Sequence, residues 1–491
     1  MRIKWILILP MLSFIISSCS KDNSSTNPID TNDEKTITIL YTNDEHGWME
    51  PADTYSGAAG MLSAWVNTEG YSESGNYLIL SGGDMWTGPA PSAWFEGEPM
   101  VQVMNAMHYN AAAIGNHEVD FGIDELLERK NQASFSFLSA NIYTKGTSDY
   151  PEFCQPYVTI EVDNISVGII GLTTLYMPGM VFPQYVENLD FISYQQALAR
   201  VVPELRALGV ELIILISHMS AYEMRSVAPI AKQYGIYLIG GGHSHELITE
   251  DVNGVTIIES GSYLRNYVRA DILFDDNIDS VLSISTVSKV NNGSSQDAVI
   301  QNIISYWQNQ SSGILNQVIG YTSSGIDQSS PQMYNMITDS WLYSYPNADI
   351  AVCNKGGVRQ SIPAGNITVS TIIGILPFEN YIVEVELTEQ QLINSINSSV
   401  FVGGMTTIGG YSLSDGTPIN LTQTYKVLFT DFWYTTSATL PSYDSAPEYT
   451  NINWRQPVID WIISLNTSPT NPLENYLDSE PRQNTYFVFE D

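Results

Sequence analysis

Five short polar motifs carry most of the side chains in this sequence that could bind a metal ion. Each motif follows a run of apolar residues that predicts a buried strand. The motifs are Thr42-Asn-Asp-Glu-His-Gly47, Ser81-Gly-Gly-Asp84, Ile114-Gly-Asn-His-Glu-Val-Asp120, Ile216-Ser-His218 and Gly240-Gly-Gly-His-Ser-His245. In an open α/β sheet, ligands bind in the crevice outside the carboxyl ends of the strands. We therefore expect the aspartate, asparagine and histidine side chains of these motifs to meet in one crevice.

The residue types indicate a transition-metal centre. Imidazole and carboxylate ligands without thiolates suit zinc, manganese, iron or cobalt rather than calcium. Asp44 and His46 are two residues apart, and His243 and His245 have the same spacing. Residues two apart in an extended segment point the same way, so each pair could address neighbouring metal ions. His108 follows a predicted helix, lacks this context and is expected to be structural.

The elements that must position these motifs follow a repeated strand-then-helix pattern. Apolar runs predict buried strands at residues 36–41, 77–80, 111–114, 167–171, 212–216, 237–239 and 255–258. Helical periodicity between them predicts helices at residues 99–107, 123–132, 194–208 and 221–234. This alternation is typical of an α/β layered domain, in which helices cover a central sheet.

A second region follows a polar stretch at residues 290–296. A helical pattern at residues 298–315 predicts a connector, and the chain of 491 residues is long enough for two or three domains. The remainder mixes helices at 334–343 and 388–397 with strands at 382–387 and 425–430. We predict a layered α/β domain over residues 36–290, a linker helix within 291–315 and a smaller α+β domain over 316–491.

The charge balance argues against one class of partner. The chain has 19 Lys and Arg residues against 53 Asp and Glu, a formal net charge of -34. Such a surface repels the phosphate backbones of DNA and RNA, so we expect no binding to nucleic-acid polymers. An anionic small molecule needs local positive charge on this protein, which bound metal ions could supply.

The N-terminal segment predicts export. Arg2 and Lys4 precede the apolar run 5–16, which is too short to span a bilayer well and ends in small residues before Cys19. The sequence Ile-Ser-Ser-Cys19 resembles the lipobox of bacterial lipoproteins, whose cysteine is acylated. An ordinary signal peptide is the alternative.

We predict a signal peptide over residues 1–19, lipidation of Cys19 and a flexible Asn/Ser/Thr-rich tether over 20–35. The lipid would anchor the protein to the outer membrane of a Gram-negative bacterium, in the periplasm or on the cell surface. Cys154 and Cys353 lie in different predicted domains and are expected to be buried thiols.

The order of the five motifs resembles that of the calcineurin-like metallophosphoesterases. The forms Thr42–Gly47 and Gly115-Asn-His-Glu-Val-Asp-Phe-Gly122 are similar to the branch that contains 5′-nucleotidases and UDP-sugar hydrolases. This resemblance implies a domain of β-sandwich sheets flanked by helices, followed by a 5′-nucleotidase C-terminal domain. It also implies two divalent metal ions, one held by Asp44, His46, Asp84 and His245 and the other by Asp84, Asn116, His218 and His243.

The resemblance further implies that His117 and Asp120 form the catalytic pair. His117 would stabilise charge in the transition state or protonate the leaving alkoxide, and Asp120 would orient its ring and raise its pKa. A hydrogen-bonding role for His117 without catalysis is the alternative.

The second region contains a turn, Asn354-Lys-Gly-Gly-Val-Arg359, that resembles the substrate-binding turn of the same family. Arg359 would meet the substrate, because a guanidinium group can donate two parallel hydrogen bonds to a phosphate. Asn354 is included in this predicted site. The nearby Leu376-Pro-Phe-Glu-Asn380 also matches the family, and we expect Phe378 and Asn380 to be mainly structural.

The segment after residue 432 departs from the family pattern. Family members that bind nucleotides usually have Gly-Gly-Asp-Gly-aromatic here, which supplies a carboxylate and one face of an aromatic clamp on the base. The other face falls near Met405, so both faces would be missing and base selectivity weakened. Trp433, Tyr434 or Tyr443 could substitute together with Asp444, or these side chains could belong to the core.

Together these features predict metal-dependent hydrolysis of phosphate esters, foremost 5′-nucleotides, by a metal-activated hydroxide that attacks phosphorus in line. Cofactors would be two divalent ions such as zinc, manganese or cobalt. A nucleotide-sugar pyrophosphatase or a 2′,3′-cyclic phosphodiesterase of the same family is an alternative, as is a non-catalytic surface lipoprotein that captures nucleotides. Because the metals and Arg359 fall in different domains, we expect the active site at the domain interface.

Overall fold

The computed structural model describes residues 34–483, apart from 53, 294, 421 and 422. The predicted signal peptide, Cys19 and the tether up to residue 33 lie outside the described residues. Residues 34 and 35, the last two of the predicted tether, already belong to strand β1 (Glu34–Thr42). In the described part of the chain, no helix combines the length and apolar character needed to span a membrane.

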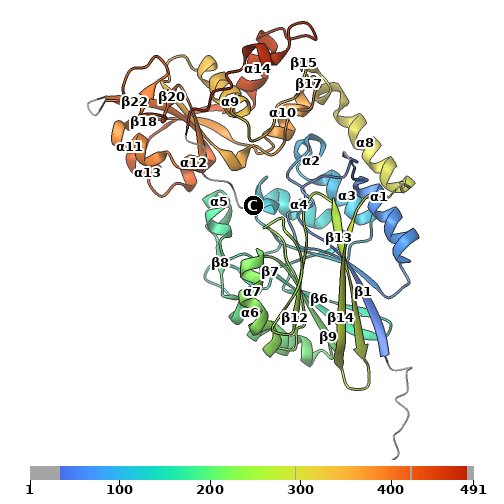
Figure 1. Ribbon diagram of the computed structural model, residues 1–491. Coiled ribbons are helices and arrows are strands. Elements are labelled where there is room, and N and C mark those ends of the chain that lie inside the picture. Colours follow the sequence, from blue (N-terminus) through green and yellow to red (C-terminus); the bar gives the residue numbers. More distant parts are fainter. Residues whose placement is uncertain (1–33, 53, 294, 421–422, 484–491) are drawn as a thin grey trace, which may run out of the picture.

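Two six-stranded sheets form the lobe that contains all five motifs (Figure 1). The first sheet has, in order, β14 (Ser280–Val290), β13 (Asn266–Asp275), β1, β2 (Tyr77–Ser81), β3 (Ala111–Ala113) and β4 (Ser136–Leu138). The second has β11 (Leu247–Val252), β12 (Val255–Ser260), β10 (Leu238–Gly240), β9 (Leu212–His218), β7 (Ile165–Thr173) and β6 (Tyr157–Val162). Strands β1 to β4 run parallel, as do β7, β9, β10 and β12. The parallel strands therefore present their carboxyl ends at one edge of each sheet.

The two sheets pack face to face around an apolar core, and helices cover both outer faces. Covering the first sheet are α1 (Gly57–Ala64), α3 (Glu98–Ala106), α4 (Ile123–Gln132) and part of α8 (Ala298–Leu315). Covering the second are α6 (Tyr194–Ala207) and α7 (Ala221–Gln233), each of which begins with a serine capping box. Smaller elements are α2 (Ala90–Trp94), α5 (Pro183–Val186) and the paired strands β5 (Ile142–Thr144) and β8 (Leu189–Phe191). The predicted layered α/β class is confirmed.

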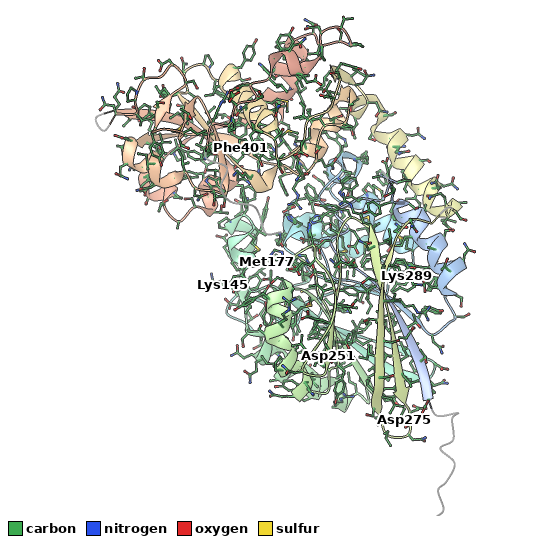
Figure 2. The ribbon with its side chains drawn as sticks, in the orientation of Figure 1. Lys145, Met177, Asp251, Asp275, Lys289 and Phe401 are labelled. Carbon is green, nitrogen blue, oxygen red and sulfur yellow. The ribbon has the colours of Figure 1, made fainter. Side chains whose placement is uncertain are left out.

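A smaller α+β lobe follows helix α8 (Figure 1). Its five-stranded sheet has, in order, β19 (Val400–Gly403), β16 (Ile350–Asn354), β22 (Thr424–Thr430), β18 (Tyr381–Thr388) and β23 (Glu448–Asn453). Its short strand pairs are β15 (Val318–Thr322) with β17 (Gly365–Thr368), and β20 (Met405–Thr406) with β21 (Ser412–Leu413). Its helices are α9 (Pro331–Ser344), α10 (Val369–Ile375), α11 (Glu389–Ser395), α12 (Asp431–Thr436), α13 (Leu440–Tyr443) and α14 (Gln456–Ser464). Figure 2 labels Phe401 inside this lobe.

Helix α8 connects the lobes and packs on both. Ile300 and Ile304 belong to the core under the first sheet. Leu315, at the other end of the helix, is buried with Ile373 of α10 and with alanines of α2. The connector is therefore packed against its surroundings along its length. Cys154 and Cys353 are buried free thiols, as predicted.

The helical turn Trp65–Glu69, which follows α1 directly, ends at the buried carboxylate of Glu69. This carboxylate connects the turn to strands β13 and β14 of the first sheet through hydrogen bonds. Glu69 accepts hydrogen bonds from Tyr267, Arg269 and Lys289 at 2.6, 2.9 and 2.7 Å, the last of which lies on β14 (Figure 2). Burial alone would raise the pKa of Glu69, but the hydrogen bond from Lys289 and its companions outweigh burial, and the pKa is lowered.

We expect Glu69→Gln to reduce the free energy of unfolding by about 1–3 kcal/mol at pH 7, because charged hydrogen bonds are lost. Since the folded-state pKa lies below the unfolded value, this stabilisation is complete above the unfolded pKa of about 4.3. It disappears as pH falls through the lower folded-state pKa. Urea unfolding of both proteins at pH 7 and at progressively lower pH would measure it. A difference that grows as the pH falls would contradict this assignment.

Candidate metal centre

Each motif lies at the carboxyl end of a strand, and side chains from both sheets meet there. Asp44 and His46 follow β1, Asp84 follows β2, Asn116 follows β3, and His243 and His245 follow β10; His218 is the last residue of β9. All these strands are parallel neighbours in their sheets, so their ends gather at one edge. The structure therefore brings together six of the seven side chains predicted to hold metal. The seventh, Asn116, precedes His117, whose backbone N–H donates to Asp84.

The local backbone differs from the prediction in one respect. Asp44, His46, Asp84, His243 and His245 have φ angles of 50°, 46°, 58°, 72° and 57°. These are left-handed conformations, so the argument that residues two apart in an extended segment point the same way is wrong here. Sharp turns at the strand ends, rather than strand alternation, aim both members of each pair inward.

One group of potential ligands is formed by Asp44, His46 and His245. The Nε2 atom of His245 lies 3.2 Å from Oδ1 of Asp44 and 3.3 Å from Nε2 of His46. Asp44 and His46 are almost fully buried. Three donor atoms thus converge on one point from two strand ends.

A second group is formed by Asp84, His218 and His243. Oδ2 of Asp84 lies 3.0 Å from Nε2 of His218 and 3.9 Å from Nε2 of His46, which belongs to the first group. Asn116 is buried nearby, and the backbone N–H of the following residue, His117, donates to Oδ1 of Asp84 at 2.8 Å. Asp84 therefore lies between the two groups, as a bridging ligand would.

Several buried polar atoms in this cluster are better suited to bind a metal ion than to form hydrogen bonds with one another. Oδ1 of Asp44, Oδ1 of Asn116 and Nε2 of His218 have no hydrogen-bond partner among the described residues. The Nδ1 atom of His218 lies 2.8 Å from the carbonyl oxygen of Gly82, which requires Nδ1 to carry the proton. In a neutral ring, the lone pair of Nε2 then faces the Asp84 carboxylate. A cation or an added proton removes this repulsion, and the residues present are those that bind divalent transition metals.

Supporting side chains hold the motifs in place, and two of them were missed at the sequence level. Glu118 accepts hydrogen bonds from the backbone N–H groups of Asp84, Met85 and Gly115, at 2.9, 2.7 and 2.6 Å. Asn43 donates to Oδ2 of Asp44 at 2.6 Å. Such contacts orient metal ligands and tune their basicity. The only sequence signal for these roles was that Asn43 and Glu118 lie within the motifs.

Neighbouring charges and burial shift the pKa values of the carboxylates in this cluster. Burial would raise the pKa of Asp84, but the imidazoles of His218 and His117 outweigh burial and hold the pKa well below its usual value. Burial, followed by the neighbouring Asp84 charge, raises the pKa of Glu118 to about 7. The strongest anionic character therefore lies on the central carboxylate rather than on its supporting glutamate.

The predicted catalytic pair borders this cluster. Nδ1 of His117 lies 2.8 Å from Oδ2 of Asp120, and its Nε2 lies 3.9 Å from Oδ2 of Asp84. Burial lowers the pKa of His117, but the carboxylates of Asp120 and Asp84 outweigh burial and the pKa is raised. The ring also stacks on Phe378, with centroids 5.5 Å apart and an interplanar angle of 25°. Phe378, expected to be mainly structural, thus contacts the predicted catalytic histidine.

The smaller lobe contributes Arg359 to the same place. Its Nη2 atom lies 3.5 Å from Nε2 of His46, and its guanidinium carbon lies 5.9 Å from the centre of the Phe378 ring. Asn354 is buried at the end of β16 and accepts a hydrogen bond from Thr430 at 3.4 Å. A cationic side chain from one lobe therefore faces the carboxylate and imidazole cluster of the other, as expected for an interface site.

Tyr443 and Asp444 have different surroundings. Oδ2 of Asp444 accepts a hydrogen bond from the backbone N–H of Glu386, in the second half of β18. Tyr443 packs against the core on one face of the five-stranded sheet. The contacts of both residues are thus within the smaller lobe, and their substrate-binding role stays a prediction.

A two-sheet α/β lobe whose strand ends gather two adjoining groups of carboxylate and imidazole ligands has the architecture of a binuclear metallohydrolase. The calcineurin-like phosphoesterase family matches residues 37–247, and the 5′-nucleotidase C-terminal domain matches residues 318–412. The chain belongs to the calcineurin-like metallophosphoesterases that carry a 5′-nucleotidase C-terminal domain.

Individual relatives agree with this assignment. The chain is 28% identical over 417 residues to a 5′-nucleotidase of Vibrio parahaemolyticus, covering 74% of each protein. It is 26% identical over 489 residues to Protein UshA of Escherichia coli, covering 84% of this chain and 88% of that protein. The crystal structure of a 5′-nucleotidase precursor from Thermus thermophilus has the same fold, with a TM-score of 0.77 at 22% identity. That match covers 91% of this chain and 99% of the other.

Proposed function

We propose that this protein hydrolyses phosphate monoesters, foremost 5′-nucleotides, in a reaction that requires two divalent metal ions. The observation that carries the proposal is the position of Asp84, whose Oδ2 lies 3.0–3.9 Å from the Nε2 atoms of His218, His46 and His117. One ion would be held by Asp44, His46, Asp84 and His245, and the other by Asp84, Asn116, His218 and His243. When bound, such ions attract the phosphate and lower the pKa of water, so that hydroxide is available near neutral pH.

Three side chains around the ions would bind the phosphoryl group and protonate the leaving oxygen. Arg359 would bind phosphoryl oxygens, because a guanidinium group matches two of them at once. His117 would donate a proton to the leaving oxygen, and Asp120 would hold the imidazole in the required orientation. The name of the Vibrio parahaemolyticus relative supports a nucleotide substrate. The cluster leaves the identity of the metal open among zinc, manganese and cobalt.

Removal and return of metal tests the proposal. After dialysis against a chelator, the protein is expected to lose hydrolysis of AMP and of p-nitrophenyl phosphate. Addition of manganese, zinc or cobalt is expected to restore both activities, and release of phosphate or p-nitrophenol would measure them. A protein that binds AMP but releases no phosphate with any of these ions would instead be a capture protein.

We also propose that the protein is exported and anchored through a lipid on Cys19, a residue that lies outside the described part of the chain. The support is the charged start, short apolar run and small residues before this cysteine. In cells, Cys19→Ser is expected to move the protein from the membrane fraction to the soluble fraction, as measured by immunoblotting. Equal membrane retention of both proteins would contradict the anchor.

A further inference from the structure

A cavity of about 320 Å³ lies within the smaller lobe, outside the candidate metal centre. Its walls come from the start of α9, from β19 and the turn before it, and from residues 407, 411 and 481–483. Figure 2 labels Phe401, which lies on β19 at one edge of the five-stranded sheet. Among the described lining residues there is no predicted metal ligand, and none of them is His117, Asp120 or Arg359. The cavity is therefore separate from the site described above.

The lining of this cavity differs in charge from the protein as a whole. The chain has 53 Asp and Glu residues against 19 Lys and Arg. The described lining residues include Lys355 and Arg482 but no aspartate or glutamate. A concave surface lined by basic side chains raises the local concentration of anions. This cavity therefore offers an anionic ligand a favourable position on an otherwise acidic protein.

Of the two basic side chains, only Lys355 is free to bind such a ligand. Arg482 donates to both carboxylate oxygens of Asp339, at 2.6 and 2.8 Å, and to Asp478 at 3.0 Å. Within the described part of the chain, the ammonium group of Lys355 has neither an ion pair nor a hydrogen bond. Burial lowers the pKa of this lysine, and no neighbouring carboxylate offsets the effect. A partly buried cation without a partner is unfavourable, and an anion in the cavity would compensate for its lost hydration.

Apolar side chains form the wall next to this lysine. The rings of Tyr334 and Phe401 stack with centroids 4.5 Å apart and an interplanar angle of 15°. Nζ of Lys355 lies 6.0 Å from the centre of the Tyr334 ring. Ile396 and Val402 extend the apolar surface. Exposed amide and hydroxyl groups form the rim, so that a small molecule can enter from solvent: Ser329, Asn397, Ser398 and Tyr411.

We propose that this cavity binds a small organic anion that combines an aromatic ring with one carboxylate group. The carboxylate would pair with Lys355, and the ring would pack against Tyr334 and the neighbouring apolar side chains. One unpaired ammonium group matches one negative charge. The volume is at the lower end of the range for small-molecule sites, which suits a ligand with a single ring. The inference does not depend on the proposed phosphoesterase function.

A pair of probes that differ only in charge tests this inference. 4-Hydroxybenzoate carries the ring and the carboxylate, and 4-hydroxybenzamide replaces the carboxylate by a neutral amide. Isothermal titration calorimetry on the metal-loaded protein is expected to show about tenfold tighter binding of the benzoate, through one charged hydrogen bond. The Lys355→Met variant should lose this preference and bind both probes with the affinity of the amide. Lys145→Met, at an exposed lysine of the larger lobe (Figure 2), is the matched control and should keep the tenfold preference.

Each outcome supports or overturns the site. A preference for the benzoate that disappears only in Lys355→Met supports it. Wild-type affinity for the benzoate in Lys355→Met overturns it, because the probe then binds elsewhere. Equal affinity of the wild type for both probes, or no binding of the benzoate, also overturns it. Circular dichroism would verify that Lys355→Met folds, and if it does not, the comparison of the two probes on the wild type still decides.

Discussion

Replacement of Asp84 by asparagine is expected to lower kcat on AMP by at least about a thousandfold while the protein stays folded. The Asp84 carboxylate lies between the two ligand groups, so its loss removes charge from both metal positions. An amide of the same shape keeps the space filled but offers no negative charge to a cation. Initial rates would be measured together with bound metal per chain by mass spectrometry, and both are expected to fall.

A matched substitution controls for the change of residue type. Asp163→Asn alters an exposed carboxylate in the turn between β6 and β7 and should leave rate and metal content at wild-type values. Circular dichroism would verify that both variants fold. Wild-type kcat and metal content in Asp84→Asn would rule out a bridging role for this carboxylate.

The second large effect is expected for His117. The His117→Ala variant should lose about 10²- to 10⁴-fold in kcat on AMP, because the proton donor is removed. We expect this variant to retain its bound metal, because all seven predicted ligands remain. Asp120→Asn should produce a smaller loss of the same kind, since the imidazole remains but its 2.8 Å contact with a carboxylate is gone.

The leaving group distinguishes proton donation from general charge stabilisation. p-Nitrophenolate departs without a proton, whereas the alkoxide of a nucleoside requires one. Rates on p-nitrophenyl phosphate are therefore expected to fall much less in His117→Ala than rates on AMP. Equal losses on both substrates would show that His117 stabilises charge and donates no proton. His108→Ala, at a partly exposed histidine beside Glu73, serves as the control.

The sequence predicted the buried parallel strands well because burial on both faces leaves an uninterrupted apolar run. Every residue of β9 is buried, for example, and this strand was predicted to within two residues. Helices α4 and α8 have the predicted bounds. The antiparallel pair β13 and β14 was not predicted. Burial alternates along β13 and no residue of β14 is fully buried, so neither strand forms a continuous apolar run.

The site was predictable where chemistry is local and unpredictable where it depends on packing between distant segments. Motifs at strand ends indicated that seven ligand side chains would meet, since parallel topology fixes where strand ends lie. The stacking of Phe378 on His117 and the approach of Arg359 to His46 depend on how the two lobes dock. Sequence spacing carries no information about such docking. Strand alternation does not place the two pairs of ligands, because the backbone leaves strand geometry before Asp44 and before His243.

The left-handed backbone at five of the predicted ligands sets a limit on how stable this lobe can be. Non-glycine residues in that conformation cost roughly 1–2 kcal/mol each. Glycine would relieve the strain but has no side chain with which to bind a cation. These five predicted metal ligands therefore lie on an energetically unfavourable backbone at the carboxyl edge of both sheets. At these few turns, the stability of the backbone and the predicted binding of metal therefore place opposite demands on the residue type.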